Sequence, residues 1–197
     1  MRSRRILFFP AVAFALCCAL TAHTQTMQAP KPGPEAQKMG MFVGHFTSDG
    51  EAKAGSMGPN SPAMKITGTE DCRWTAGGFA ILCTGSSQVG DMKSTETALM
   101  WYDASDKMYH YHDVDSTGNV GDSAGSADGD TWTWTGKDSM GGQVMSTKYT
   151  MKGVSKNGYD WTLAMGDSES NEQEAMTGKV TRAMAAAKPM AAKPAAQ

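Results

Sequence analysis

Ten short stretches of this chain alternate between apolar and polar residues with a period of two, and residues that favour turns separate them. A period of two places successive side chains on opposite faces of an extended strand, so the pattern predicts short antiparallel β-strands. Asp128-Gly129 and Asn157-Gly158 are typical of tight hairpin turns, and Gly141-Gly142 is equally permissive. The expected strands span 45–54, 64–75, 79–86, 95–102, 108–114, 119–126, 131–137, 143–152, 159–165 and 172–181.

One short helix is expected over 35–42, because Pro34 suits a first helical position and Gly44 follows the segment. So few helical residues cannot cover the faces of a sheet, and the strands must protect their own edges. Two packed sheets would do so, but a closed barrel is the favoured solution. The expected fold class is therefore all-β, an antiparallel up-and-down β-barrel of about ten strands. A barrel of this size encloses more room than side chains alone need to fill, so a ligand cavity is physically possible.

The glycine pair Gly77-Gly78 lies midway between Cys72 and Cys83, so a hairpin folded there places the two cysteines opposite each other. A two-residue turn would make them a hydrogen-bonded pair, whereas a four-residue loop over 76–79 puts them at the closer, non-hydrogen-bonded spacing. The closer spacing suits the Cβ separation of about 3.8 Å in a disulfide. We therefore predict the wider loop and a disulfide worth about 3 kcal/mol. Two reduced, packed thiols are the alternative.

The first residues are typical of an export signal, since Arg2, Arg4 and Arg5 precede an apolar run over 6–20. General secretion is favoured over the twin-arginine route, and a periplasmic or secreted location is expected. No comparable apolar run follows, so no membrane span is expected after signal removal. Removing the three arginines takes the formal net charge from −2 to −5, and no basic patch for nucleic acid is evident. The expected organisation is a signal peptide over 1–25, a Pro-rich lead-in over 26–34, the barrel domain over 35–182 and a disordered Ala/Lys/Pro tail over 183–197.

Four aromatic residues are candidate ligand-binding residues. Tyr109 and Tyr111 share one strand face, and Trp132 and Trp134 share a face of another strand. Such pairs either fill a core or line an apolar cavity, and core filling is the commoner use. The 16 methionines are scattered without a repeated short spacing, which favours gap filling over Cu(I) binding.

His110 and His112 are candidate metal ligands, because residues two apart on a strand project to the same side. A third ligand is not identifiable from the sequence, and His45 or Asp115 could join only through tertiary contact. A plain polar strand face is the alternative. Asp113, Asp115 and Asp130 are carboxylates that could gather near one end of the barrel, although solvated turn residues are the default interpretation.

Several short motifs resemble a bacterial family known only as a domain of unknown function. They are Pro32-Gly33-Pro34-Glu35, Phe42-Val43-Gly44, Thr67-Gly68-Thr69-Glu70, Cys72-Arg73-Trp74, Gly77-Gly78-Phe79, Tyr102-Asp103, Asp115-Ser116 and Gly129-Asp130-Thr131-Trp132. The opening Gly44-His45-Phe46 is also similar to the Gly-x-Trp element of lipocalin and fatty-acid-binding-protein (calycin-type) barrels, with phenylalanine in place of tryptophan. The resemblance implies a lipocalin-like barrel without an assigned activity. Nitrobindin-type barrels, which hold haem, are more distant, because Ser48 stands where their opening has a glycine.

Catalysis has no support from sequence motifs. The chain carries no serine elbow, no histidine-bearing zinc helix and no phosphate-cradling glycine loop. Two function classes therefore stay in view, with no cofactor expected. The first is a binding protein for a small, largely apolar molecule held in the barrel. The second is a structural or interaction module of the cell envelope, and a metal- or haem-binding barrel is a more remote third.

Overall fold

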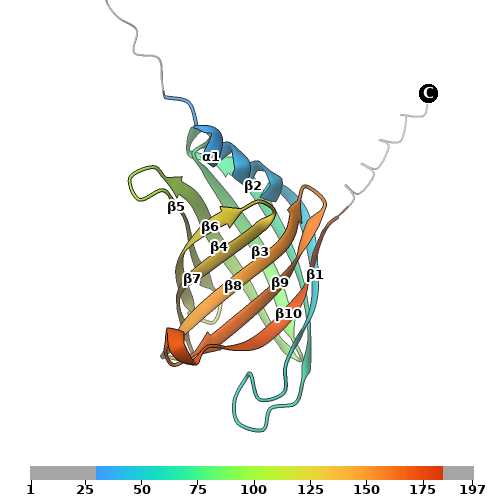
Figure 1. Cartoon of the computed structure of the whole chain (residues 1–197). Helices are drawn as coiled ribbons and strands as arrows, with labels where there is room; N and C mark the ends of the chain where they lie inside the picture. The colour runs from blue at the N-terminus through green and yellow to red at the C-terminus, as the bar shows by residue number, and fades with distance from the viewer. Residues whose placement is uncertain (1–29, 184–197) are drawn as a thin grey trace, which may run out of the picture. The chain divides into compact units, whose positions relative to one another are not determined.

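A computed structural model of the chain describes residues 30–183. The expectations for the signal peptide and for the tail from residue 184 onward lie outside the described residues, as do residues 26–29 of the lead-in. Ten antiparallel strands form a closed barrel in which each strand pairs with the next and β1 pairs with β10 (Figure 1). The predicted fold class is confirmed. The strands are β1 (Gly44–Ala52), β2 (Met64–Thr75), β3 (Ala80–Val89), β4 (Met92–Asp103), β5 (Met108–Asp115), β6 (Val120–Asp128), β7 (Thr131–Met140), β8 (Gln143–Ser155), β9 (Gly158–Gly166) and β10 (Gln173–Arg182).

The largest difference from the expected boundaries lies at the β3–β4 hairpin. Both strands continue three residues beyond their expected ends, until Val89 pairs with Met92 across a two-residue turn. Ser86 and Ser87 have little intrinsic preference for strands, which explains why the sequence pattern stopped there. Pairing with β2 on one side and β4 on the other keeps these serines extended.

The cysteine hairpin forms as predicted. Thr75 pairs with Ala80, so the loop comprises the four residues 76–79, and Gly77 has a φ of 67°. Cys72 pairs directly with Cys83, with 4.1 Å between their Cα atoms, the short spacing of a non-hydrogen-bonded pair. Their sulfur atoms are 2.07 Å apart and form a disulfide. The cross-link joins β2 to β3 near the end of the barrel where the helix lies.

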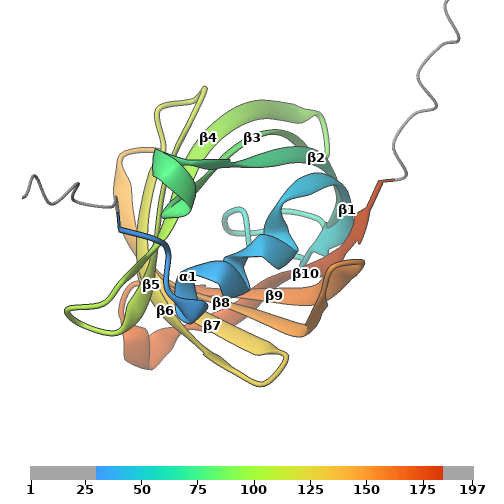
Figure 2. The ribbon, with the colours of Figure 1, turned by 90° about the horizontal axis from the view of Figure 1, so that it is seen from above.

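A short helical segment covers one end of the barrel. It consists of α1 (Pro34–Lys38) and a 3₁₀ turn (Met39–Phe42), and Figure 2 shows it lying across the mouth. Ala36, Met39 and Phe42 are buried, because they face inward at the helical spacing of three residues. The Phe42 ring meets Trp132 edge-on, with 5.0 Å between the ring centroids. Among the described residues, no helix has the length and apolar character needed to cross a membrane.

Hydrogen bonds from two side chains hold this segment in place. The Tyr109 hydroxyl donates a hydrogen bond to Glu35 Oε2 at 2.8 Å, which ties α1 to β5. Arg182, at the end of β10, donates from its guanidinium to the carbonyl of Val43 at 2.9 Å and to that of Met41 at 3.1 Å. The N-terminal segment is therefore anchored to both the middle and the last strand of the chain.

Candidate functional site

The barrel contains a cavity of about 360 Å³, to which all ten strands contribute. Inward-facing positions recur every second residue along each strand, so small residues at several of them leave space in the middle of the barrel. Ser48, Gly68, Ser87 and Ser123 are such positions. The side chains around this space are either aromatic and aliphatic or small, polar and acidic. The lining residues are Phe46, Thr47, Ser48, Ile66, Thr67, Gly68, Thr69, Glu70, Ser86, Ser87, Glu96, Tyr111, Asp113, Ser123, Trp134, Asp138, Thr147, Tyr149, Met151, Tyr159, Leu163 and Val180.

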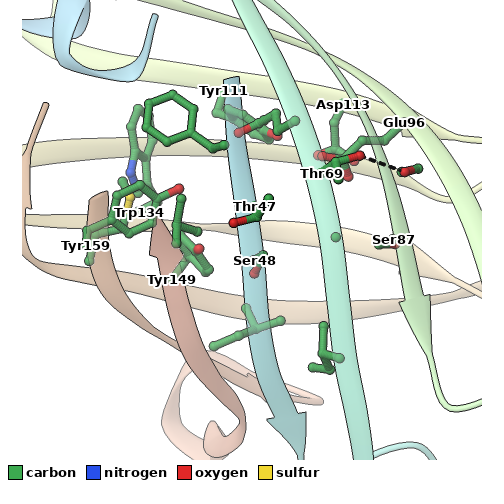
Figure 3. Close-up of a pocket in the computed structure, with 18 of the residues that line it drawn as sticks. Thr47, Ser48, Thr69, Ser87, Glu96, Tyr111, Asp113, Trp134, Tyr149 and Tyr159 are labelled. Carbon is green, nitrogen blue, oxygen red and sulfur yellow. Dashed lines mark hydrogen bonds between the residues drawn. The ribbon is translucent and has the colours of Figure 1, made fainter. Parts of the chain in front are cut away.

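Three aromatic side chains of the cavity lie across from two of its carboxylates. Figure 3 shows Trp134, Tyr149 and Tyr159, from β7, β8 and β9, on one side. Asp113 and Glu96 lie on the other side, on β5 and β4. The cavity can therefore accommodate a molecule that has an apolar part and a polar part.

Four carboxylates line the cavity, and the strand register places a glycine between the members of each pair. Gly85 on β3 pairs with Glu70 on one side and Glu96 on the other. We call the set Glu70, Glu96, Asp113 and Asp138 the acid belt.

In the second pair, Gly121 on β6 pairs with Asp113 of β5 and Asp138 of β7. A Cβ at residue 121 would collide with Asp113 Oδ1 and lie 2.9 Å from Asp138 Oδ1. A Cβ at residue 85 would lie 3.4 Å from Glu96 Oε1. The glycines thus supply the room in which these carboxyl groups lie.

The environment of the acid belt favours the neutral acids. Burial raises the pKa of Glu70 to about 7, and the nearby Glu96 charge adds to the effect. Burial likewise raises the pKa of Asp138 to about 6, with a further contribution from Asp113. The pKa values of Glu96 and Asp113 are also raised, chiefly by burial. No lysine or arginine is among the cavity-lining residues in the described part of the chain.

Three tyrosines supply hydroxyl groups to the same space. Burial raises the pKa of Tyr111, Tyr149 and Tyr159, and the acid-belt charges raise it further. The phenols therefore stay protonated at neutral pH and can donate hydrogen bonds. Tyr149 also stacks on Trp161, with 5.7 Å between the ring centroids, and this packing orients the Tyr149 ring.

The four aromatic residues singled out from the sequence all face the barrel interior, but at two levels. Tyr111 and Trp134 line the cavity. Tyr109 and Trp132 are buried nearer the helical segment and are absent from the lining, with 4.5 Å between their ring centroids. The four rings form a continuous cluster, since Trp132 stacks on Trp134 at 6.2 Å.

His110 and His112 lie on the outer face of β5, on the side opposite the inward-facing Tyr109 and Tyr111. His110 stacks on Trp101, and its Nε2 is 2.9 Å from Asp106 Oδ2. The possible metal ligands here are Asp103, Asp106 and His110, and this group does not include His112.

The two residues considered as a third metal ligand have other partners. His45 Nε2 is 3.0 Å from Asp71. Asp115 accepts hydrogen bonds from the backbone of Thr117 and Asn119. No histidine of residues 30–183 is among the cavity-lining residues, so within that range the cavity offers no imidazole to a haem iron.

Three members of the acid belt were not identified from the sequence. Asp113 was considered with Asp115 and Asp130, but Asp130 lies in the β6–β7 turn, at the end of the barrel opposite the β5–β6 turn that follows Asp115. A usable signal was present, because Asp113 follows Tyr111 by two residues and Asp138 follows Trp134 by four. Each shares a strand face with an inward-facing aromatic residue. Glu70 shares its face with Ile66 and Cys72, and Glu96 shares its face with Met100, so apolar neighbours marked these faces as well.

The fold and the cavity together define a ten-stranded antiparallel barrel protein with an internal binding-sized space. The family described as protein of unknown function (DUF1579) matches residues 31–182, and the chain belongs to this family. The barrel is also similar to the crystal structure of Rv2717c from M. tuberculosis, with a TM-score of 0.54 and 11% sequence identity over 77% of this chain and 99% of that chain. At this identity the likeness extends to the fold alone. No curated protein matches the sequence.

Proposed function

We propose that this protein is exported and binds a small molecule inside its barrel. The observation that carries the proposal is the cavity of about 360 Å³, whose wall combines aromatic and aliphatic side chains with hydroxyl and carboxyl groups. Ligand sites commonly have volumes from about 300 Å³ upward and this mixed lining. The bound molecule would place its apolar part against Trp134, Tyr149 and Leu163.

Export is supported by the disulfide between Cys72 and Cys83. Disulfides persist mainly in oxidising compartments such as the periplasm or the extracellular space. This agrees with the apolar segment that follows three arginines at the start of the sequence.

A neutral apolar fluorophore, N-phenyl-1-naphthylamine, tests the binding proposal. We expect saturable fluorescence enhancement with the wild-type domain and its loss on Ser87→Leu, which places a larger side chain in the cavity. Thr84→Leu is the matched control, because Thr84 lies on the same strand, is exposed and is not among the residues that line the cavity. Ser87→Leu also removes the hydrogen bond between the Ser87 and Ser94 hydroxyls.

Equal fluorescence changes with both variants would contradict the proposal, because the dye would then not be in the cavity. Native mass spectrometry of protein purified from its own source gives an independent reading. A co-purifying small molecule is the expected result. A clean apo mass together with no dye binding would favour the alternative of a structural or interaction module.

A further inference from the structure

We propose that the molecule held in the barrel carries a protonated amine or another organic cation, which the acid belt recognises. This inference rests on the proposed function, because it specifies the chemistry of the ligand in the same cavity. It restricts the ligand to an amphiphile with a cationic end and an apolar body.

The acid belt takes part in no ion pair within the described structure. The ion pairs of residues 30–183 are formed by other acidic residues, and none includes a member of the acid belt. Glu70 keeps part of its surface accessible although it lies deep in the barrel, so that surface faces the cavity. Its carboxylate accepts no hydrogen bond from the described residues, and the charge that raises its pKa further is that of Glu96, which has the same sign.

Ionising the acid belt without a counter-cation costs free energy. An ionised carboxylate removed from bulk water is unfavourable unless a positive charge or hydrogen bonds compensate it. Protonation removes the charge, but the acid belt is then a set of neutral acids. A bound cation would compensate the charge and gain affinity from it, because it would meet carboxylates that form no ion pair among residues 30–183.

The spacing of the carboxylates favours an organic cation over a metal ion. A divalent metal needs several oxygen ligands within about 2.0–2.6 Å of one point. No three members of the acid belt bring their oxygen atoms within 4.8 Å of one another. The carboxylates are distributed along the wall in two pairs, around Gly85 and Gly121. This spacing suits an ammonium group with several N–H donors better than a compact coordination sphere.

The aromatic side chains of the cavity suit the apolar part of such a ligand. Trp134, Tyr149 and Tyr159 present aromatic rings to the same cavity (Figure 3). Aromatic rings attract cations through their π-electrons and also bury aliphatic carbon. An alkyl or aryl amine can therefore satisfy both sides of the cavity at once.

A matched ligand series tests the proposal by calorimetry at pH 8 with octylamine, octanol and octanoate. These probes share one apolar chain and differ in the charge of the head group. We expect octylammonium to bind the wild-type domain about tenfold or more tightly than octanol, and octanoate to bind most weakly. The double variant Glu70→Gln/Asp138→Asn should reduce this preference to within about twofold. Asp71→Asn is the control, because Asp71 follows Glu70 on β2 and pairs with His45 on the outer face.

The outcomes separate this inference from the proposed function. Equal affinity for octylammonium and octanol would overturn the cationic ligand and leave a neutral cavity ligand standing. No binding of any of the three probes, together with no dye binding, would overturn both. Titration with CaCl₂ or ZnCl₂ alone tests whether a metal ion, and not an organic cation, binds to the acid belt. Saturable metal binding that is lost in the double variant would assign the acid belt to a metal ion and contradict the proposal.

Discussion

Asp113 and Asp138 approach the same point of the barrel interior from opposite sides of Gly121. The residues are 25 positions apart in the sequence, and they face each other because β5, β6 and β7 are consecutive antiparallel strands in register. Gly121 has no side chain, so both carboxyl groups extend into the space above it. The cavity owes its acidic side to this relationship and to the equivalent one around Gly85.

The glycines of the barrel wall should differ in their tolerance of a methyl group. Gly121→Ala meets the ends of two flexible aspartate side chains, which can rotate away, so we expect a loss of less than about 1 kcal/mol in the free energy of unfolding. Gly136→Ala instead meets the backbone, with Ser123 Cα 2.6 Å from the new Cβ, and should cost about 1–3 kcal/mol. Urea unfolding of the two variants measures the difference. Equal losses would show that the acid pair is rigidly held.

Glu70 should make the stability of the domain depend on pH. Its pKa rises from 4.5 in the unfolded chain to about 7 in the folded barrel, so the folded state binds the proton more tightly. Its contribution to stability is therefore complete below about pH 4.5 and is lost as the pH rises towards 7. Glu70→Gln removes this loss, and we expect the variant to be more stable than wild type by about 2–3 kcal/mol at pH 8 but nearly equal at pH 4. Chemical unfolding at the two pH values checks this, and a difference that does not change with pH would contradict it.

The disulfide should contribute measurably to stability. Cys72→Ala/Cys83→Ala removes a cross-link between residues separated by 11 positions, and loss of the closed loop should lower the free energy of unfolding by about 3 kcal/mol. Dithiothreitol should destabilise the wild-type domain to a similar extent. The double variant is the internal control, because it has no disulfide to reduce. A response of the double variant to the reductant would indicate that the effect does not arise from this bond.

The helical segment across the barrel mouth should depend on Phe42. This side chain is 6% exposed and packs against Trp132 and Tyr159, so Phe42→Ala should cost about 3 kcal/mol. Phe79→Ala is the matched control, since Phe79 is 39% exposed in the cysteine hairpin and should cost less than about 1 kcal/mol. Thermal unfolding of both variants tests the expectation. Similar losses would mean that Phe42 does not anchor the segment.

The sequence by itself determined the strands, the turns and the covalent cross-link, because these depend on neighbours along the chain. Period-two alternation placed β2 at its observed bounds, and the spacing of Cys72, Gly77-Gly78 and Cys83 specified the four-residue loop. Each of these features is set by a local backbone preference or by a short distance in sequence. The closed topology also followed, since so many strands with so little helix must protect their edges.

Only the tertiary structure decided which face of each strand points inward and which residues meet across the barrel. Alternation sorts residues onto two faces, and Glu70 and Glu96 each have apolar neighbours on their own face, but the pattern does not tell which residues of other strands they meet across the barrel. Their meeting depends on the register of β2, β3 and β4, which the closure of the whole barrel fixes. The acid belt is a property of that register, because charge burial and pairing are set by neighbours in space and not by neighbours in sequence.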